Sequence, residues 1–228
     1  MSNFSKSFQE SPYWYHGTSQ QFDSWLCPPP QKPGDEPLVA HKCLFFTSNI
    51  DFASGAGSWL ARVSLASHAN ILDATANYNA AEQLRRKIKD LDLISQTLNV
   101  QHDFWHQHWK TGHVLRAVFT DPLLQLEFNR QINNIAHEYG IPEKVAEFIF
   151  KQNITRGLIE TICTAARILG YDGIFGYEID KNPDTGREIS QPWLAVFSKE
   201  TISTPYWMTE EELSNVPKRC FDDDFGRY

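Results

Sequence analysis

The feature that most constrains the fold is a long helical stretch between two segments that resemble β-strands. From Asn79 to about Leu169, apolar residues recur every three to four positions, which is the spacing of an amphipathic helix. Breakers at Gly112, Pro122 and Gly140 divide this stretch into about four or five predicted helices. We therefore expect the order β, then α, then β, which is typical of an α+β protein.

Short aromatic runs flank the helical stretch and predict β-strands. Before it, SPYWYHGTS, CLFFTS at 43–48 and SWLARVSL predict three strands, the third ending near residues 71–73. The run NIDFASGAG, between the second and third strands, begins with an Asn or Asp, Asn49 or Asp51, suited to capping a short helix. After the helical stretch, GYDGIFGYEI and QPWLAVFSK predict two strands joined by the polar turn DKNPDTGRE. Alternation places Phe45 and Phe46 on opposite faces of their strand.

Length and composition predict one globular domain. The chain has 228 residues, of which 41% are hydrophobic and 13% aromatic, so we expect a single domain over residues 1–228 with a substantial core. The parts are a β-rich segment at 13–73, a helical insertion at about 79–169 and strands within 170–202. The net charge of −7 disfavours wholesale wrapping of nucleic acid or anionic membrane.

The sequence also predicts a cytosolic location, in the producing cell or after delivery into a host. It shows no secretory signal and no apolar run long enough to span a membrane. Its four cysteines have no CxxC spacing, so we expect reduced thiols and no zinc ribbon.

Three groups of residues carry chemistry in combination, although each alone is typical of an ordinary core strand. The first is Tyr15-His16-Gly17-Thr18-Ser19, and the second is the aromatic strand LFFTS with the following NIDFA. The third comprises GYDGI at 170–174 and WLAVF at 193–197 with Thr201-Ile202. In this order and spacing they resemble the ADP-ribosyltransferase family, especially the small bacterial and phage members of the diphtheria-toxin and poly(ADP-ribose) polymerase branch. The resemblance covers roughly residues 13–73 and 168–202.

The resemblance implies a split, mostly antiparallel β core with NAD bound as a substrate in the cleft between two sheets. His16 would hydrogen-bond the adenosine ribose, and the backbone of Gly17 and Thr18 would surround the nicotinamide amide. Phe45 would stack on nicotinamide in place of the family's usual tyrosine, and Thr47 would support the pocket through its hydroxyl. A glycine at position 17 also leaves room for close approach of a dinucleotide.

The catalytic acid is where this sequence departs from the family. An acid is expected four residues before the aromatic that matches Phe197, and Trp193 occupies that position. Glu188, Gln191 and Glu178 are the candidates that remain nearby. We favour Glu188, whose turn could bring it beside Gln191, and we keep Glu178 in reserve because a partly buried carboxylate has a raised pKa.

Two other charged or metal-binding patterns receive structural interpretations. His102 and His106 share a helical face, but the HExxH pattern is absent, so no metal site is predicted. The RRKIK run at 85–89 could contact phosphates, although its spacing is more typical of a solvated helix face.

The predicted function is transfer of ADP-ribose from NAD to a macromolecule, with release of nicotinamide, by a toxin-like or effector enzyme. The acceptor is a protein or a nucleic acid, an antitoxin or immunity protein is an expected partner, and no membrane association is expected. One alternative is a catalytically inactive NAD- or nucleotide-binding module of the same fold, since Phe45 and Trp193 replace the expected tyrosine and acid. Another is a helical interaction protein with a β scaffold.

Overall fold

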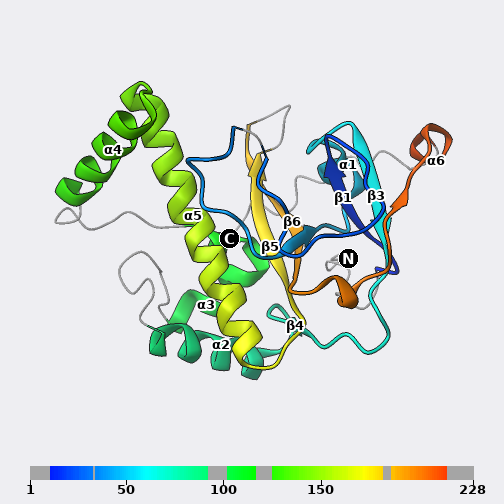
Figure 1. Ribbon diagram of the computed structural model, residues 1–228. Helices are drawn as coiled ribbons and strands as arrows, with labels where there is room; N and C mark the ends of the chain where they lie inside the picture. The colour runs from blue at the N-terminus through cyan, green and yellow to red at the C-terminus, as the bar shows by residue number, and fades with distance from the viewer. Residues whose placement is uncertain (1–10, 33, 92–101, 117–124, 182–185, 215–228) are drawn as a thin grey trace.

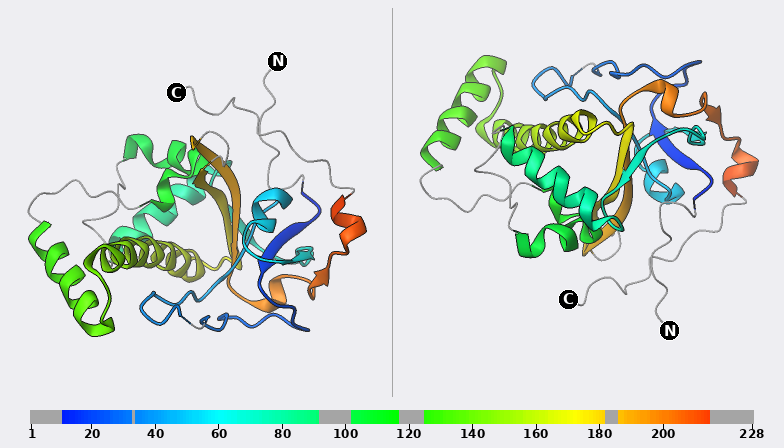
Figure 2. Two further views of the ribbon diagram at one scale, coloured as in Figure 1. Left: turned by 90° about the horizontal axis from the view of Figure 1, so that it is seen from above. Right: turned by 90° about the horizontal axis from the view of Figure 1, so that it is seen from below.

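Two β-sheets and a set of helices form the computed structural model of this chain (Figure 1). The structure describes residues 11–32, 34–91, 102–116, 125–181 and 186–214. Seen from above and below, the larger sheet lies between the long helices and the smaller sheet (Figure 2). This mixed arrangement, with the long helices gathered on one side of a mostly antiparallel core, agrees with the α+β class that the sequence predicts.

The smaller sheet has the order β1-β3-β7, with both pairs antiparallel. Its strands are β1 (Trp14–Thr18), β3 (Trp59–Val63) and β7 (Tyr206–Trp207). Five residues of β1 pair with five of β3, from Trp14 opposite Val63 to Thr18 opposite Trp59. This register places His16 in the middle of β1, opposite Ala61.

The larger sheet has the order β2-β6-β5-β4. Its strands are β2 (Leu44–Phe46), β6 (Glu188–Val196), β5 (Gly173–Lys181) and β4 (Ile71–Asp73). The two long strands, β5 and β6, form nine antiparallel residue pairs. The turn predicted between them includes residues 182–185, which lie outside the described residues.

The third predicted strand is in fact two strands, one in each sheet. After β3 ends, the N–H of Ala66 donates to the carbonyl of Thr201, and a turn closes from Ala69 to Ala66. The chain then enters the larger sheet as β4, which runs parallel to β5. The apolar residues at 71–73 therefore do not extend β3, because the intervening turn redirects the chain.

Alternation along β5 and β6 separates two hydrophobic cores. Phe175 and Leu194 belong to the core shared with the smaller sheet, together with Trp14 and Phe46. Ile174, Ala195 and Trp193 belong to the core shared with the helices. Because the side-chain period of a strand is two residues, the larger sheet contributes to both cores.

The described part of the helical stretch contains four α-helices, in agreement with the periodicity of the sequence. They are α2 (Tyr78–Asp90), α3 (His102–Thr111), α4 (Gln125–Tyr139) and α5 (Glu143–Ile168). The shorter helices are α1 (Ile50–Ser54), η2 (His113–Leu115), η4 (Lys199–Thr201) and α6 (Glu210–Ser214). Helix α5 runs beside the larger sheet, and α4 packs against its N-terminal half (Figure 1).

A β-bridge between Tyr15 and Thr47 joins the two sheets where β1 and β2 meet. The N–H of Tyr15 donates to the carbonyl of Thr47 at 2.8 Å, and the N–H of Thr47 donates to the carbonyl of Tyr15 at 3.0 Å. This bridge fixes β1 next to β2. It therefore brings the HGT segment beside the aromatic strand that follows it by about thirty residues in the sequence.

Candidate functional site

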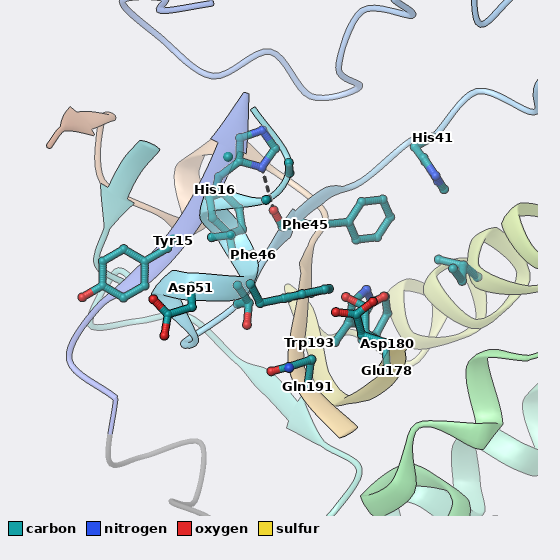
Figure 3. Close-up of a pocket in the computed structure, with 17 residues that line it drawn as sticks. Tyr15, His16, His41, Phe45, Phe46, Asp51, Glu178, Asp180, Gln191 and Trp193 are labelled. Carbon is teal, nitrogen blue, oxygen red and sulfur yellow. Dashed lines mark hydrogen bonds between the residues drawn. The ribbon is translucent and has the colours of Figure 1, made fainter. Parts of the chain in front are cut away.

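A cleft of about 580 Å³ lies where β1 and β2 meet the ends of β5 and β6 (Figure 3). Helix α1 and the segment before β2 complete its walls, and Ile159 of α5 also contributes. Both sheets supply residues to it. The ionisable and amide side chains that line it are Tyr15, His16, His41, Asp51, Glu178, Asp180 and Gln191.

His16 presents a neutral imidazole with a defined tautomer. Its Nδ1 lies 2.8 Å from the carbonyl oxygen of Phe45. Because a carbonyl only accepts hydrogen bonds, Nδ1 carries the hydrogen and Nε2 of the neutral ring is an acceptor. Burial is the main reason that the pKa of His16 is lowered, and the positive charge of Lys32 lowers it further against the effect of the Phe45 carbonyl. The ring can therefore accept a hydrogen bond from a ligand hydroxyl.

Gly17 and Thr18 differ in their relation to the cleft. Gly17 lines it, but a Cβ at this position would lie 1.9 Å from the carbonyl oxygen of Ala53 in α1. The glycine is thus required first for the packing of α1 on β1, and not only for ligand approach. The Thr18 side chain is buried and is not among the residues that line the cleft.

Phe45 has the exposure and neighbours of a stacking residue. It is half-buried and lines the cleft, whereas Phe46 is buried in the core between the sheets, as alternation predicts. The Phe45 ring stacks on Trp193, with centroids 5.7 Å apart and an angle of 26° between the planes. The His41 and Phe45 rings form a T-shaped contact with their centroids 4.7 Å apart. Figure 3 shows Phe45 between these two residues.

Thr47 supports the cleft through a short hydrogen-bond network. Its hydroxyl accepts from the N–H of Asn49 at 3.1 Å. The Asn49 amide oxygen accepts from the backbone N–H groups of Asp51 and Phe52 in α1, and the amide nitrogen donates to Oε1 of Gln191 at 2.7 Å. The helix cap predicted from the sequence therefore also holds Gln191, which is buried. The supporting role predicted for the Thr47 hydroxyl fits this geometry.

Glu178 and Gln191 are brought together by the register of the long strands. They are directly opposite each other on β5 and β6, and both line the cleft. Burial raises the pKa of the Glu178 carboxyl to about 7, while the charge of Arg116 lowers it and that of Asp180 raises it by smaller amounts. The negative charge of a carboxylate in this environment is poorly solvated. A positive charge that forms in the cleft would therefore interact strongly with it.

Glu188 lies elsewhere. It is the first residue of β6, pairs with Lys181 and is exposed, with its carboxylate 3.9 Å from Nε2 of His113. It is not among the residues that line the cleft. Glu188 and Gln191 are three positions apart along β6, which is an odd interval, so the pleat directs the two side chains to opposite faces of the strand. The structure thus brings Glu178, and not Glu188, beside Gln191.

Trp193 occupies the position where the resemblance expects an acid. Its side chain is buried in the core shared with the helices. Glu178 projects from the neighbouring strand two residue pairs away, since Trp193 is opposite Gly176 and Gln191 is opposite Glu178. A carboxylate is therefore present on the neighbouring strand near the expected position, although it comes from β5 and not from β6.

Several residues of the cleft or beside it were not predicted as site residues from the sequence. His41, Asp51 and Asp180 line it, and Asn49 positions Gln191. The helix cap was a sequence signal for Asn49, whereas His41 lies in an irregular segment where no periodic pattern identifies a functional residue. Lys32 lies close enough to His16 for its charge to affect the imidazole.

The other sequence patterns have structural roles in the described residues. No group of three potential metal ligands occurs in the described part of the chain; the side chain of His102 lies outside it, and His106 packs edge-on against Tyr78. In the RRKIK run, Arg85 is buried and paired with Glu82 at 2.6 Å, and Arg86 contacts the same carboxylate. Neither arginine lines the cleft.

Comparisons with known proteins identify no family for this chain, so the functional argument is based on the site. No family model and no curated protein matches this chain. One solved structure that it resembles is described as the crystal structure of an anti-CRISPR protein, with 14% sequence identity, 86% of this chain and 94% of that chain covered, and a TM-score of 0.38. Among the described residues, no helix has the length and apolar character needed to cross a membrane.

Proposed function

We propose that this chain is an NAD-dependent mono-ADP-ribosyltransferase that modifies a protein or a nucleic acid. The observation that carries the proposal is the convergence on one cleft of a neutral histidine acceptor, a half-buried aromatic ring and a carboxylate with a raised pKa. These three residues, His16, Phe45 and Glu178, come from β1, β2 and β5. The order of motifs in the sequence supports the same function.

The residues have complementary roles toward NAD. His16 accepts a hydrogen bond from a ribose hydroxyl at Nε2, and Phe45 stacks on nicotinamide. Lys32, whose positive charge acts on His16, offsets the pyrophosphate charge. Cleavage of the bond between C1′ and the nicotinamide nitrogen leaves the electron pair on nicotinamide and an oxocarbenium-like ribose. Ionised Glu178 stabilises that cation, with Gln191 fixed beside it by Asn49. The acceptor bonds to C1′ as nicotinamide leaves.

A second candidate function is a nucleotide-binding module without catalysis. The buried Trp193 at the position of the expected acid, stacked on Phe45, favours it. Such a module would keep the binding residues and lack turnover. Binding of NAD therefore does not distinguish the two functions, but release of nicotinamide does.

The decisive experiment measures nicotinamide release from NAD by the purified full chain, together with NAD binding by calorimetry. Release supports the transferase, binding without release supports the module, and absence of binding contradicts both. Incubation of the protein with labelled NAD and a cell lysate, followed by nuclease or protease digestion, would identify the class of the labelled acceptor. Delivery as a toxin or effector predicts growth inhibition when the chain is expressed.

A further inference from the structure

A segment that precedes β2 is tied to one face of α5 and carries His41 to the mouth of the cleft. The Asn153 amide bonds to the backbone of Val39 and Pro37 at 2.7 and 2.8 Å. Arg156 donates to the carbonyl of Val39 at 3.1 Å. Glu160 accepts from the N–H of Lys42 at 3.0 Å. The three α5 side chains are three and four residues apart, so they share one helix face.

His41 and Glu160 form a histidine–carboxylate pair beside the proposed reaction site. Nδ1 of His41 lies 3.1 Å from Oε1 of Glu160, and the two side chains are 22% and 12% exposed. When the ring is neutral, donation from Nδ1 to Glu160 leaves Nε2 as a proton acceptor with a fixed orientation. His41 lines the cleft and is also partly exposed to solvent. An acceptor that enters the cleft from outside could therefore reach it.

The His41–Glu160 pair lies close to the place where the reacting carbon of NAD would sit. The centroids of the His41 and Phe45 rings are 4.7 Å apart, and Phe45 is the proposed stacking partner of nicotinamide. C1′ is bonded directly to the nicotinamide nitrogen, so the reacting carbon lies next to the ring that stacks here. The negative charge of Glu178 stabilises the cation. The acceptor must also lose a proton, and the roles proposed for His16 and Phe45 do not include removal of that proton.

We propose that His41, oriented by Glu160, is the general base that deprotonates the acceptor, and that the acceptor is therefore a neutral group bearing an O–H or N–H hydrogen. The inference rests on the proposed transferase function. In the step, the acceptor oxygen or nitrogen forms a bond to C1′ as the C1′–nicotinamide bond breaks. The acceptor proton goes to Nε2 of His41, nicotinamide leaves as a neutral molecule, and Glu160 stabilises the imidazolium.

Two small nucleophiles test this role without knowledge of the natural acceptor. Ethanol must lose a proton to form ethyl ADP-ribose, whereas azide needs no base. For His41→Gln, which keeps a donor toward Glu160, we expect the ethyl product to fall by about 100-fold and the azido product to stay within about twofold of wild type. For Glu160→Gln we expect a fall of about tenfold or more in the ethyl product alone.

Arg156→Gln is the matched control, because it removes another contact between the segment and α5 without touching the histidine. It should leave both products near wild-type levels. Added imidazole should restore ethyl transfer in His41→Gly, which a merely structural role would not allow. Equal losses of the ethyl and azido products in His41→Gln, or unchanged ethyl transfer, would overturn the role of His41 while nicotinamide release still supports the transferase. A wild-type protein that releases no nicotinamide would overturn the transferase and this inference together.

Discussion

Glu178 and Gln191 are directly opposite each other on β5 and β6 and face the same cleft. Directly paired residues on one face of an antiparallel pair have Cβ atoms about 5 Å apart, which places the carboxyl beside the amide. Gln191 is in turn held by Asn49, the cap of α1. The proposed catalytic carboxylate is thus surrounded by a rigid sheet and a fixed helix terminus.

Glu178→Gln should abolish most turnover with little effect on NAD binding. The carboxylate acts on positive charge that develops only in the transition state, so we expect nicotinamide release to fall by about 100- to 1,000-fold. Calorimetry should show nearly unchanged affinity. Glu188→Gln is the control, because Glu188 is exposed and outside the cleft. If Glu188→Gln lost activity and Glu178→Gln kept it, the catalytic acid would be Glu188, as the sequence analysis favoured.

The raised pKa of Glu178 also predicts a pH-dependent effect on stability. In the folded chain this pKa is about 7, above its ordinary value of 4.5. Between these values the unfolded chain ionises first, so the group lowers stability as pH rises, and the full penalty remains above about pH 7. Glu178→Gln should therefore raise the thermal midpoint at pH 8 and leave it unchanged near pH 4. An equal shift at both pH values would show that the carboxyl is not desolvated as described.

Local sequence patterns predicted the elements of the site better than its chemistry. The strand that carries His16, the alternation of Phe45 and Phe46, and the Asn49 cap all depend on neighbouring residues, and the structure contains each of them. The pairing of Glu178 with Gln191 depends on the register of a hairpin whose turn has no two-residue signature. The sequence favoured Glu188 because that register is not a local property.

His41 illustrates a second limit of sequence analysis. It lies in an irregular segment, and its partner Glu160 is 119 residues away on α5. Periodicity identifies helix faces and strand faces, but it does not indicate which loop residue will meet which helix. The contacts of α5 with this segment are formed by polar side chains, which a search for apolar stripes does not distinguish from a solvated helix face.

His16→Ala should weaken NAD binding. Its Nε2 is the proposed acceptor for a ribose hydroxyl, and loss of a buried partner typically costs about 1–3 kcal/mol, or about fivefold to 150-fold in affinity. Calorimetry on a folded variant measures this directly. His137→Ala, an exposed histidine on α4, is the matched control and should bind normally. Unchanged affinity in His16→Ala would remove this residue from the site.

Variants of Phe45 should show whether NAD binding depends on an aromatic ring at this position or on the hydroxyl of the family's usual tyrosine. Phe45→Ala removes the ring and should weaken NAD binding by about 1 kcal/mol, or about fivefold, whereas Phe45→Tyr keeps the ring and should be nearly neutral or improved. Turnover should follow the same order. Phe148→Ala, which removes an exposed ring on α5, controls for general loss of aromatic surface. Equal activity of the two Phe45 variants and wild type would mean that Phe45 contacts no substrate.

Gly17→Ala tests whether this glycine serves the fold or only the ligand. The added Cβ would lie 1.9 Å from the carbonyl oxygen of Ala53 and 3.0 Å from the Cβ of Ala56, so α1 would have to move away from β1. Such overpacking against backbone should cost about 3 kcal/mol of unfolding free energy even without NAD. Gly157→Ala is the control, because Gly157 lies within α5 with nothing near the new methyl group and should gain about 0.5–1 kcal/mol.

The two roles of Gly17 predict different results in thermal unfolding. If α1 packing requires the glycine, the midpoint falls in the absence of NAD, and NAD affinity falls with it because α1 forms one wall of the cleft. If the glycine serves only close approach of the dinucleotide, the midpoint is unchanged and affinity alone is lost. The 1.9 Å approach to a backbone carbonyl favours the first result, since a main-chain atom in a capped helix has no alternative rotamer.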